Sequence, residues 1–138
     1  MDRIKVYLTL IGNEFDPNCV TEKTGIEPDS IRTKHEKLGN GEFFGHTEWG
    51  IESPLVTGKE IEPVLWQLFD RLSCTPQTLY KIGEECGGKW DILFLLEICD
   101  EDGPVLYFSR NTIQYAAEMG AAIGFDTYIK LETVSEEQ

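Results

Sequence analysis

Apolar and polar residues alternate near the start of the chain, over residues 3–11. A period of two residues predicts a half-buried strand. Its apolar face would carry Ile4, Val6, Leu8 and Leu10. Asp16 and Pro17 then form a helix cap followed by a first-turn proline, and Gly25 favours a left-handed helix end. We therefore expect a strand and then a short helix up to Thr24.

Residues 29–52 begin with a polar segment and continue with alternating apolar and polar positions. Residues 29–42 are polar and contain the turn sequence Gly39-Asn40-Gly41, so we expect an exposed loop with a mobile tip. Residues 43–52 alternate again, which predicts a second strand. One side of that strand would carry Phe43, Thr47, Trp49 and Ile51.

Helical periodicity follows in two segments. Residues 60–72 place apolar side chains three or four positions apart, which predicts an amphipathic helix. Those positions are Ile61, Val64, Leu65, Leu68, Phe69 and Leu72. Thr75 and Pro76 repeat the combination of a cap and a proline, and Gly87 and Gly88 follow eleven positions later. We expect a second helix between these two signals.

The rest of the chain predicts two strands, one helix and a final strand. Residues 90–99 are apolar at both alternating sets of positions, which is typical of a strand in the centre of a sheet. A turn at residues 100–103 and an apolar segment at 105–108 predict a hairpin. Ser109 caps an expected helix through Met119. On the last strand, residues 122–131, one face would carry Asp126, Tyr128 and Lys130 and the other Ile123, Phe125, Thr127, Ile129 and Leu131.

The expected order of elements is β-α-β-α-α-β-β-α-β. Strands with one polar face and helices on the other predict a two-layer α+β sandwich. We expect a mostly antiparallel, five-stranded sheet with the helices on one face. Residues 1–131 would form one domain, and residues 132–138 a solvated acidic tail.

Charge restricts the classes of partner. The 138 residues contain 12 Lys and Arg and 25 Asp and Glu, a formal net charge of −13. Phosphate groups are bound by cations, so we expect neither nucleic acid nor an anionic membrane surface as a partner. A basic protein would instead be attracted over a distance. The same charge also serves solubility alone.

Location and cysteine chemistry follow from what the chain lacks. No apolar run approaches the roughly 18 residues of a membrane span, and the strand pattern begins at once without a signal-peptide pattern. We therefore expect a cytoplasmic protein with reduced thiols. Cys19, Cys74, Cys86 and Cys99 form no CxxC pair, so we expect no metal site. No phosphate-binding or nucleophile motif is present, so we expect no cofactor and no catalytic residue.

Five residues are candidates for a binding site. Thr24 and Glu27 would line the end of the first helix, although helix termination explains this segment equally. Trp49 offers a stacking surface and an indole N–H, although a large ring also suits a core. Asp126, beside Tyr128, would have a raised pKa if it lay in the interior, and would be solvated or ion-paired if it shared the polar face with Lys130.

Some of these segments resemble those of a bacterial domain-of-unknown-function family, number 4279. The resemblance lies in Asp16-Pro17, Thr21 and Gly25-Ile26-Glu27-Pro28, in Trp49 after a glycine-bearing loop, and in the closing sequence from Gly120-Ala121 to Phe125-Asp126-Thr127-Tyr128. It covers nearly the whole chain. It implies a small cytosolic α+β domain with no established activity, and it supplies no catalytic residue.

Three hypotheses of function remain. The first is a non-enzymatic protein-binding module, similar to an immunity protein or antitoxin, for a basic bacterial partner. The second is a small-molecule-binding domain or weak enzyme with a pocket near Trp49 and Asp126. The third is self-association, for example as a homodimer, through unprotected strands at the edges of the sheet.

Overall fold

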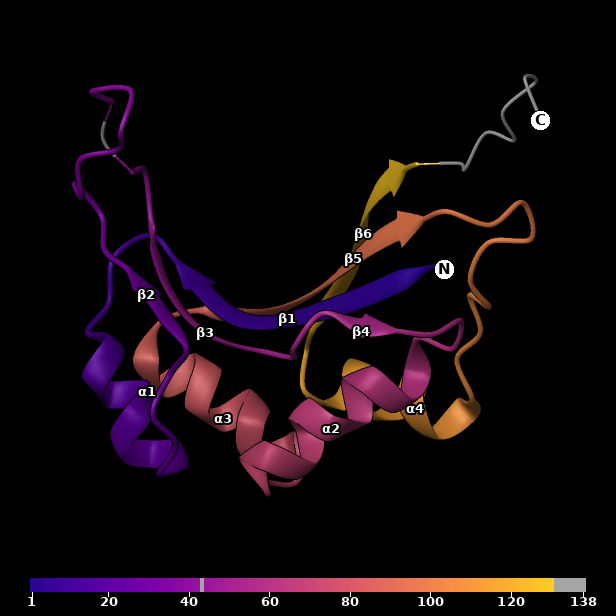
Figure 1. Cartoon of the computed structure of the whole chain (residues 1–138). Coiled ribbons are helices and arrows are strands. Elements are labelled where there is room, and N and C mark those ends of the chain that lie inside the picture. Colours follow the sequence, from indigo (N-terminus) through magenta and orange to yellow (C-terminus); the bar gives the residue numbers. More distant parts are fainter. Residues whose placement is uncertain (43, 131–138) are drawn as a thin grey trace.

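The computed structural model describes residues 1–42 and 44–130. In this part of the chain, six strands form one curved sheet and four helices cover its lower face (Figure 1). The elements are β1 (Arg3–Gly12), α1 (Pro17–Thr24), β2 (Ser30–Arg32), β3 (Thr47–Glu52), β4 (Val56–Thr57), α2 (Glu62–Leu72), α3 (Pro76–Cys86), β5 (Lys89–Ile98), α4 (Arg110–Glu118) and β6 (Ala122–Ile129). The predicted α+β class is confirmed, with six strands instead of five.

The strand order is β2-β3-β1-β5-β6, and β4 pairs with the beginning of β1. β1 runs antiparallel to β3, β4 and β5, and β2 runs antiparallel to β3. β5 and β6 are parallel, because α4 lies between them in the chain and returns it to the same end of the sheet. The sheet is therefore mixed.

The core lies between the sheet and the helices. The alternating apolar positions that predict β1 are fully buried against the helices. Antiparallel pairing with β5 adds a second buried row, made of Trp90, Ile92, Phe94 and Leu96. Burial stabilises each such large side chain by roughly 1.5–3 kcal/mol.

The predicted signals at the ends of α1 operate in the structure. Asp16 Oδ1 accepts a hydrogen bond from Asn18 N at 3.0 Å. Gly25 adopts φ 72°, a conformation that side chains other than that of glycine rarely tolerate. Asp16 thus begins the helix and Gly25 ends it, at the positions that the sequence predicts.

The predicted hairpin over residues 90–108 is wrong. Residues 105–108 form no strand, and Val105 makes an isolated parallel bridge to Glu60. The backbone N–H of Val105 donates to Lys59 O at 2.6 Å, so this segment leads toward α2. β5 instead has β6 as its neighbour on the side away from β1.

Two short strands are absent from the prediction. β2 lies within the expected loop, and all three of its side chains are exposed, so no apolar alternation marks it. β4 has two residues, and it follows Ser53 and Pro54, where the pairing with β1 is interrupted. Ser53 fills this interruption, since its Oγ accepts from Val6 N at 2.9 Å.

An arm connects β2 to β3 and rises from one end of the sheet (Figure 1). We call residues 33–42 and 44–46 the arm. The backbone N–H of His35 donates to Phe44 O at 3.0 Å, and that of Phe44 donates to Glu36 O at 2.7 Å. β3 begins at Thr47 instead of residue 43. Phe43, Leu131 and the predicted tail at 132–138 lie outside the described residues.

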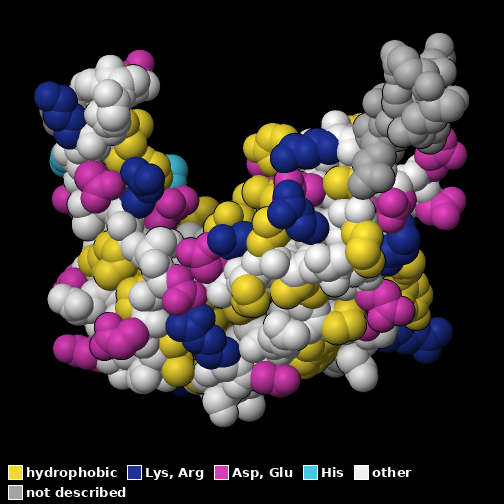
Figure 2. Space-filling view, in the orientation of Figure 1, with side chains coloured by type: hydrophobic (Ala, Val, Ile, Leu, Met, Phe, Trp, Pro, Cys, Tyr) yellow, Lys and Arg dark blue, Asp and Glu magenta, His cyan; other side chains and the backbone are white. Residues whose placement is uncertain are grey.

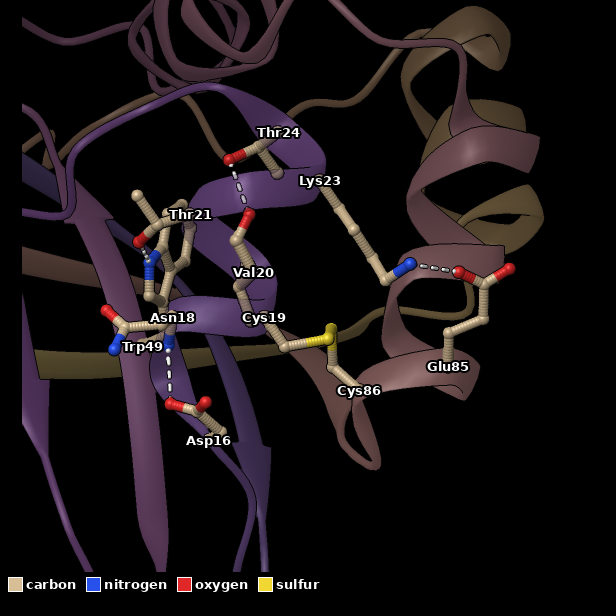
Figure 3. Close-up of a disulfide and its surroundings, with 10 residues drawn as sticks. All are labelled: Asp16, Asn18, Cys19, Val20, Thr21, Lys23, Thr24, Trp49, Glu85 and Cys86. Atoms are coloured by element: carbon tan, nitrogen blue, oxygen red, sulfur yellow. Dashed lines mark hydrogen bonds and ion pairs between the residues drawn. A yellow bond between two sulfur atoms is a disulfide. The ribbon is translucent and has the colours of Figure 1, made fainter.

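A disulfide contradicts the expectation of four reduced thiols. Cys19 of α1 and Cys86 at the end of α3 are bonded, with their Cα atoms 5.9 Å apart (Figure 3). Beside the disulfide, Lys23 Nζ lies 2.7 Å from Glu85. Cys74 and Cys99 are free cysteines. Sequence spacing does not reveal this pair because the two residues are far apart in the chain and adjacent only after α1 and α3 pack together.

We expect the disulfide to stabilise the fold by about 2–4 kcal/mol, because it restricts the unfolded chain over a long loop. Reduction should therefore lower the midpoint of thermal unfolding of the unmodified protein. The Cys19→Ser/Cys86→Ser double variant should unfold at the lower midpoint with and without reductant. Cys99→Ser is the matched control and should keep the sensitivity to reductant. An equal midpoint for the oxidised and reduced protein would contradict this role.

Candidate functional site: the open face of the sheet

The face of the sheet opposite the helices is concave. Figure 2 shows a hollow between the arm on the left and the ends of β5 and β6 on the right. We call this surface the open face. Odd-numbered positions of β1 and β5 and even-numbered positions of β3 and β6 point toward it, because the alternate positions are buried against the helices or aligned with that buried face. Its floor contains the half-buried residues Tyr7, Thr9, Ile11, Leu93 and Leu95.

Most charges near one end of the open face are neutralised. Glu97 is 7% exposed, and its Oε1 lies 2.7 Å from Lys130 Nζ and 2.9 Å from Arg3 Nη2. The hydrogen bond from Lys130, helped by Arg3, holds the pKa of Glu97 below its ordinary value although burial opposes this. Lys5 pairs with Glu52 at 2.6 Å, and the pKa of Lys5 is raised by that partner.

Asp91, toward the other end of β5, has no such partner in the described chain. It lies on β5 opposite Thr9 of β1, and its side chain is half-buried. Within residues 1–42 and 44–130, its carboxylate makes no hydrogen bond or ion pair. Burial raises the pKa of Asp91, and the negative charge of Glu48 on β3 raises it further. The floor therefore holds a carboxylate that lacks a cation among the described residues.

The carboxylate of Glu48 contacts a side chain that can carry a positive charge. His46, at the base of the arm, lies with Nε2 3.2 Å from Glu48 Oε1. This contact is an ion pair only when the imidazole is protonated. The part of the open face near the arm thus carries the carboxylates of Asp91 and Glu48 together with Lys89 of β5.

Asp126 and Tyr128 lie at the outer edge of the open face, on β6. Tyr128 Oη donates to Asp126 Oδ2 at 3.2 Å, which raises the pKa of Tyr128. Asp126 shares this polar face with Lys130, as the alternation predicts. Lys130, however, pairs with Glu97 instead of Asp126.

Trp49 lies on the opposite face of the sheet, in the core. It is fully buried, and its Nε1 donates to Thr21 Oγ1 at 3.0 Å (Figure 3). Trp90 packs against it edge-on, with ring centroids 6.2 Å apart, and donates its own indole N–H to Leu79 O. Trp49 and Asp126 thus lie on opposite faces of the sheet, so the structure does not bring these two residues together.

Thr24 and Glu27 belong to a third place, beyond the end of α1. Thr24 Oγ1 donates to Val20 O at 2.8 Å and accepts from Ile26 N at 3.2 Å. The carbonyl of Glu27 accepts from Arg71, and its side chain is exposed. The contacts of Thr24 stabilise the end of α1, and the contact of Glu27 joins the following segment to α2. Neither residue is joined to the open face.

Sequence reasoning missed the floor of the open face. The signal was present in β5, where Leu93 and Leu95 make the second alternating set apolar. The pattern predicts a strand in the centre of the sheet, which β5 is, but it does not indicate that these two side chains are only half-buried on an uncovered face. Apolar residues on an uncovered sheet face are a feature of interaction surfaces.

A cavity of about 250 Å³ lies at the start of α2, away from the open face. It is lined by Glu60, Ile61, Glu62, Pro63, Val105 and Tyr107. The carboxylate of Glu62 accepts from Ser109 N and from Thr112 Oγ1, so it caps α4. Burial opposes ionisation, but these hydrogen bonds lower the pKa of Glu62. One of the two carboxylates that line the cavity therefore has structural partners.

Neither metal ligation nor a membrane span is evident in the part of the chain that the structure describes. No group of three or more His, Cys, Asp or Glu is placed to hold a metal ion. None of the described helices combines the length and the apolar character that crossing a membrane requires.

A protein-family model described as a domain of unknown function, DUF4279, matches residues 2–130. The chain belongs to the DUF4279 family. Comparison with curated proteins and with solved structures found no match. The open face is thus a surface of a DUF4279 domain.

We expect Asp91→Asn to stabilise the protein at pH 7, by about 0.5 kcal/mol. The raised pKa means that ionised Asp91 is disfavoured in the fold, so its stability penalty appears as pH rises through the folded-state pKa. The gain should shrink as the pH falls below about 4, the ordinary pKa of aspartate, because the carboxyl then becomes protonated in both the folded and the unfolded state. Urea unfolding at several pH values measures it.

Glu52→Gln is the matched control for this prediction. It removes one negative charge from the same face, but it breaks the pair with Lys5. We expect it to lower stability at pH 7 instead of raising it. Equal effects of the two substitutions would show that net charge alone, and not the missing partner of Asp91, determines the result.

Proposed function

We propose that this DUF4279 domain is a non-enzymatic binding module that holds a basic segment of another protein on its open face. The observation that carries the proposal is the half-buried carboxylate of Asp91, which lacks a cation among the described residues, whereas Glu52 and Glu97, elsewhere on the same face, are paired. A lysine or arginine side chain from a partner would supply that cation.

The shape and composition of the open face support a protein partner. Half-buried Tyr7, Leu93 and Leu95 provide apolar area, and aromatic residues contribute strongly to protein interfaces. The arm and the opposite strand ends bound the hollow in Figure 2. A bound segment would pack its apolar atoms on the floor and place its charge near Asp91 and Glu48.

The overall charge supports the sign of the partner. A net charge of −13 attracts a basic protein before contact and raises the rate of association at low salt. Inhibition of a basic enzyme, in the manner of an immunity protein or antitoxin, is one activity that such binding would produce.

The cytoplasmic location expected from the sequence stays a prediction. The Cys19–Cys86 disulfide is more typical of oxidising compartments. The proposed binding does not depend on the compartment, because the disulfide joins two helices that lie on the other side of the sheet (Figure 1).

A synthetic lysine-rich peptide provides the first test. In NMR titrations, we expect it to shift the backbone amides of Tyr7, Leu93 and Leu95, and to bind more weakly as salt is added. Asp91→Asn should weaken binding about 10-fold, the equivalent of about 1.4 kcal/mol. A glutamate-rich peptide of the same length should cause no shifts.

The matched control is Glu22→Gln, which removes the same charge from the exposed surface of α1. It should reduce the affinity only slightly. Equal losses for Asp91→Asn and Glu22→Gln, or shifts confined to the helices, would overturn the proposed site.

A further inference from the structure

β6 is an edge strand with an unusual amount of exposed apolar surface. It pairs with β5 on one side, and no described strand lies on its other side. Ile129 is 69% exposed, Tyr128 47% and Phe125 44%. Proteins normally protect such an edge with proline, charges, bulges or a cover, because its free N–H and C=O groups invite another strand.

The opposite edge of the sheet, formed by β2, is shorter and carries a charged side chain. β2 has three residues, and one of them is Arg32, whose guanidinium pairs with Glu36. β6 has eight residues and contains no proline. Its one charged side chain, Asp126, points to the open face and accepts from Tyr128 of the same strand. The long edge is therefore the less protected one.

The backbone direction of β6 identifies the groups at this edge. Lys130 N donates to Ile98 O at 2.7 Å, so the peptide groups of even-numbered residues are directed toward β5. Since successive residues of a strand alternate, Phe125, Thr127 and Ile129 direct their N–H and C=O groups outward. These three residues can form hydrogen-bonded pairs with a further strand.

We infer that β6 pairs antiparallel with β6 of a second copy of this chain, around a twofold axis at Thr127. This inference goes beyond the proposed binding of a basic partner. In this register Thr127 faces Thr127, Phe125 faces Ile129 twice, and Asp126 faces Tyr128 twice. The hydrogen bond between Tyr128 and Asp126 inside one strand can thus also form between the two copies.

Self-complementarity selects this register among its neighbours. An axis at Asp126 would place two carboxylates directly opposite each other, which is unfavourable. An axis at Tyr128 would place Phe125 opposite residue 131, beyond the end of β6. The axis at Thr127 instead covers the two exposed apolar side chains of the buried-face row, Phe125 and Ile129, with each other.

Twofold pairing also keeps equivalent faces together. Residues directly opposite each other in an antiparallel pair point to the same face. The helices of both copies would therefore lie on one side of a continuous sheet, and the two open faces would lie side by side on the other. Each copy would keep its own Asp91 accessible, so dimer formation and binding of a basic partner are independent properties.

Sedimentation analysis of the full chain over a range of concentrations tests the dimer. We expect a concentration-dependent dimer, and Ile129→Lys should weaken it about 100-fold because each dimer contains two copies of the substitution. Leu106→Lys is the matched control. It changes an exposed leucine in the segment between β5 and α4, and it should leave the dimer unchanged.

Cross-linking tests the register separately. In a Cys74→Ser/Cys99→Ser background, Thr127→Cys should give a covalent dimer under mild oxidation, because opposed Cα atoms of a hydrogen-bonded pair lie about 5.5 Å apart. Ser30→Cys, on β2, should not. A monomer at all concentrations, a dimer unaffected by Ile129→Lys, or cross-linking at Ser30 but not at Thr127 would overturn the inference. None of these outcomes affects the peptide titration.

Discussion

The pairing of β1 with β5 is the constraint on which the remaining structure depends. The two strands form nine residue pairs, from Arg3 with Glu97 to Ile11 with Lys89. This register places both buried rows on the same side, so the helices can cover them with one apolar layer. A shift by one residue would expose the core of β1. Every other long strand is attached to one of these two.

Asp2 fixes one end of this pairing. It is almost fully buried, and its Oδ1 accepts from Cys99 N at 2.8 Å and from Asp100 N at 3.0 Å, just beyond the end of β5. Burial alone would raise the pKa of Asp2, but these hydrogen bonds and the contact with Lys59 lower it overall. A charged group thus stabilises the register because all of its bonds are satisfied.

Local patterns in the sequence predicted the elements whose signals are local. The alternation over residues 3–11 and the caps at Asp16 and Gly25 all operate in the structure. The predicted hairpin failed because turn residues at 100–103 are compatible with several paths, and only the tertiary neighbours of β5 select one. The Cys19–Cys86 bond and strand β2 likewise depend on segments that meet only after folding.

The candidate site was less predictable for a related reason. Alternation assigns residues to two faces of each strand, but it does not say which faces of different strands coincide. The side-chain chemistry of Trp49 and Asp126 suggests a common site, but the pairing of β3, β1, β5 and β6 places them on opposite faces of the sheet. Asp91 gave no signal of its own, because a single acidic residue in a strand is unremarkable until its neighbours are known to lack a cation.

The β1–β5 pairing also has a consequence for folding kinetics. Its partners, such as Ile4 and Leu96, lie nearly a whole domain apart in the chain. Closing so large a loop costs entropy before any strand contact compensates for it, and contacts of this kind slow folding. The helices have 8 to 11 residues, so they are only marginally stable until the sheet covers their apolar sides. The period before the two central strands meet is therefore when this chain is most vulnerable to aggregation and most in need of a chaperone.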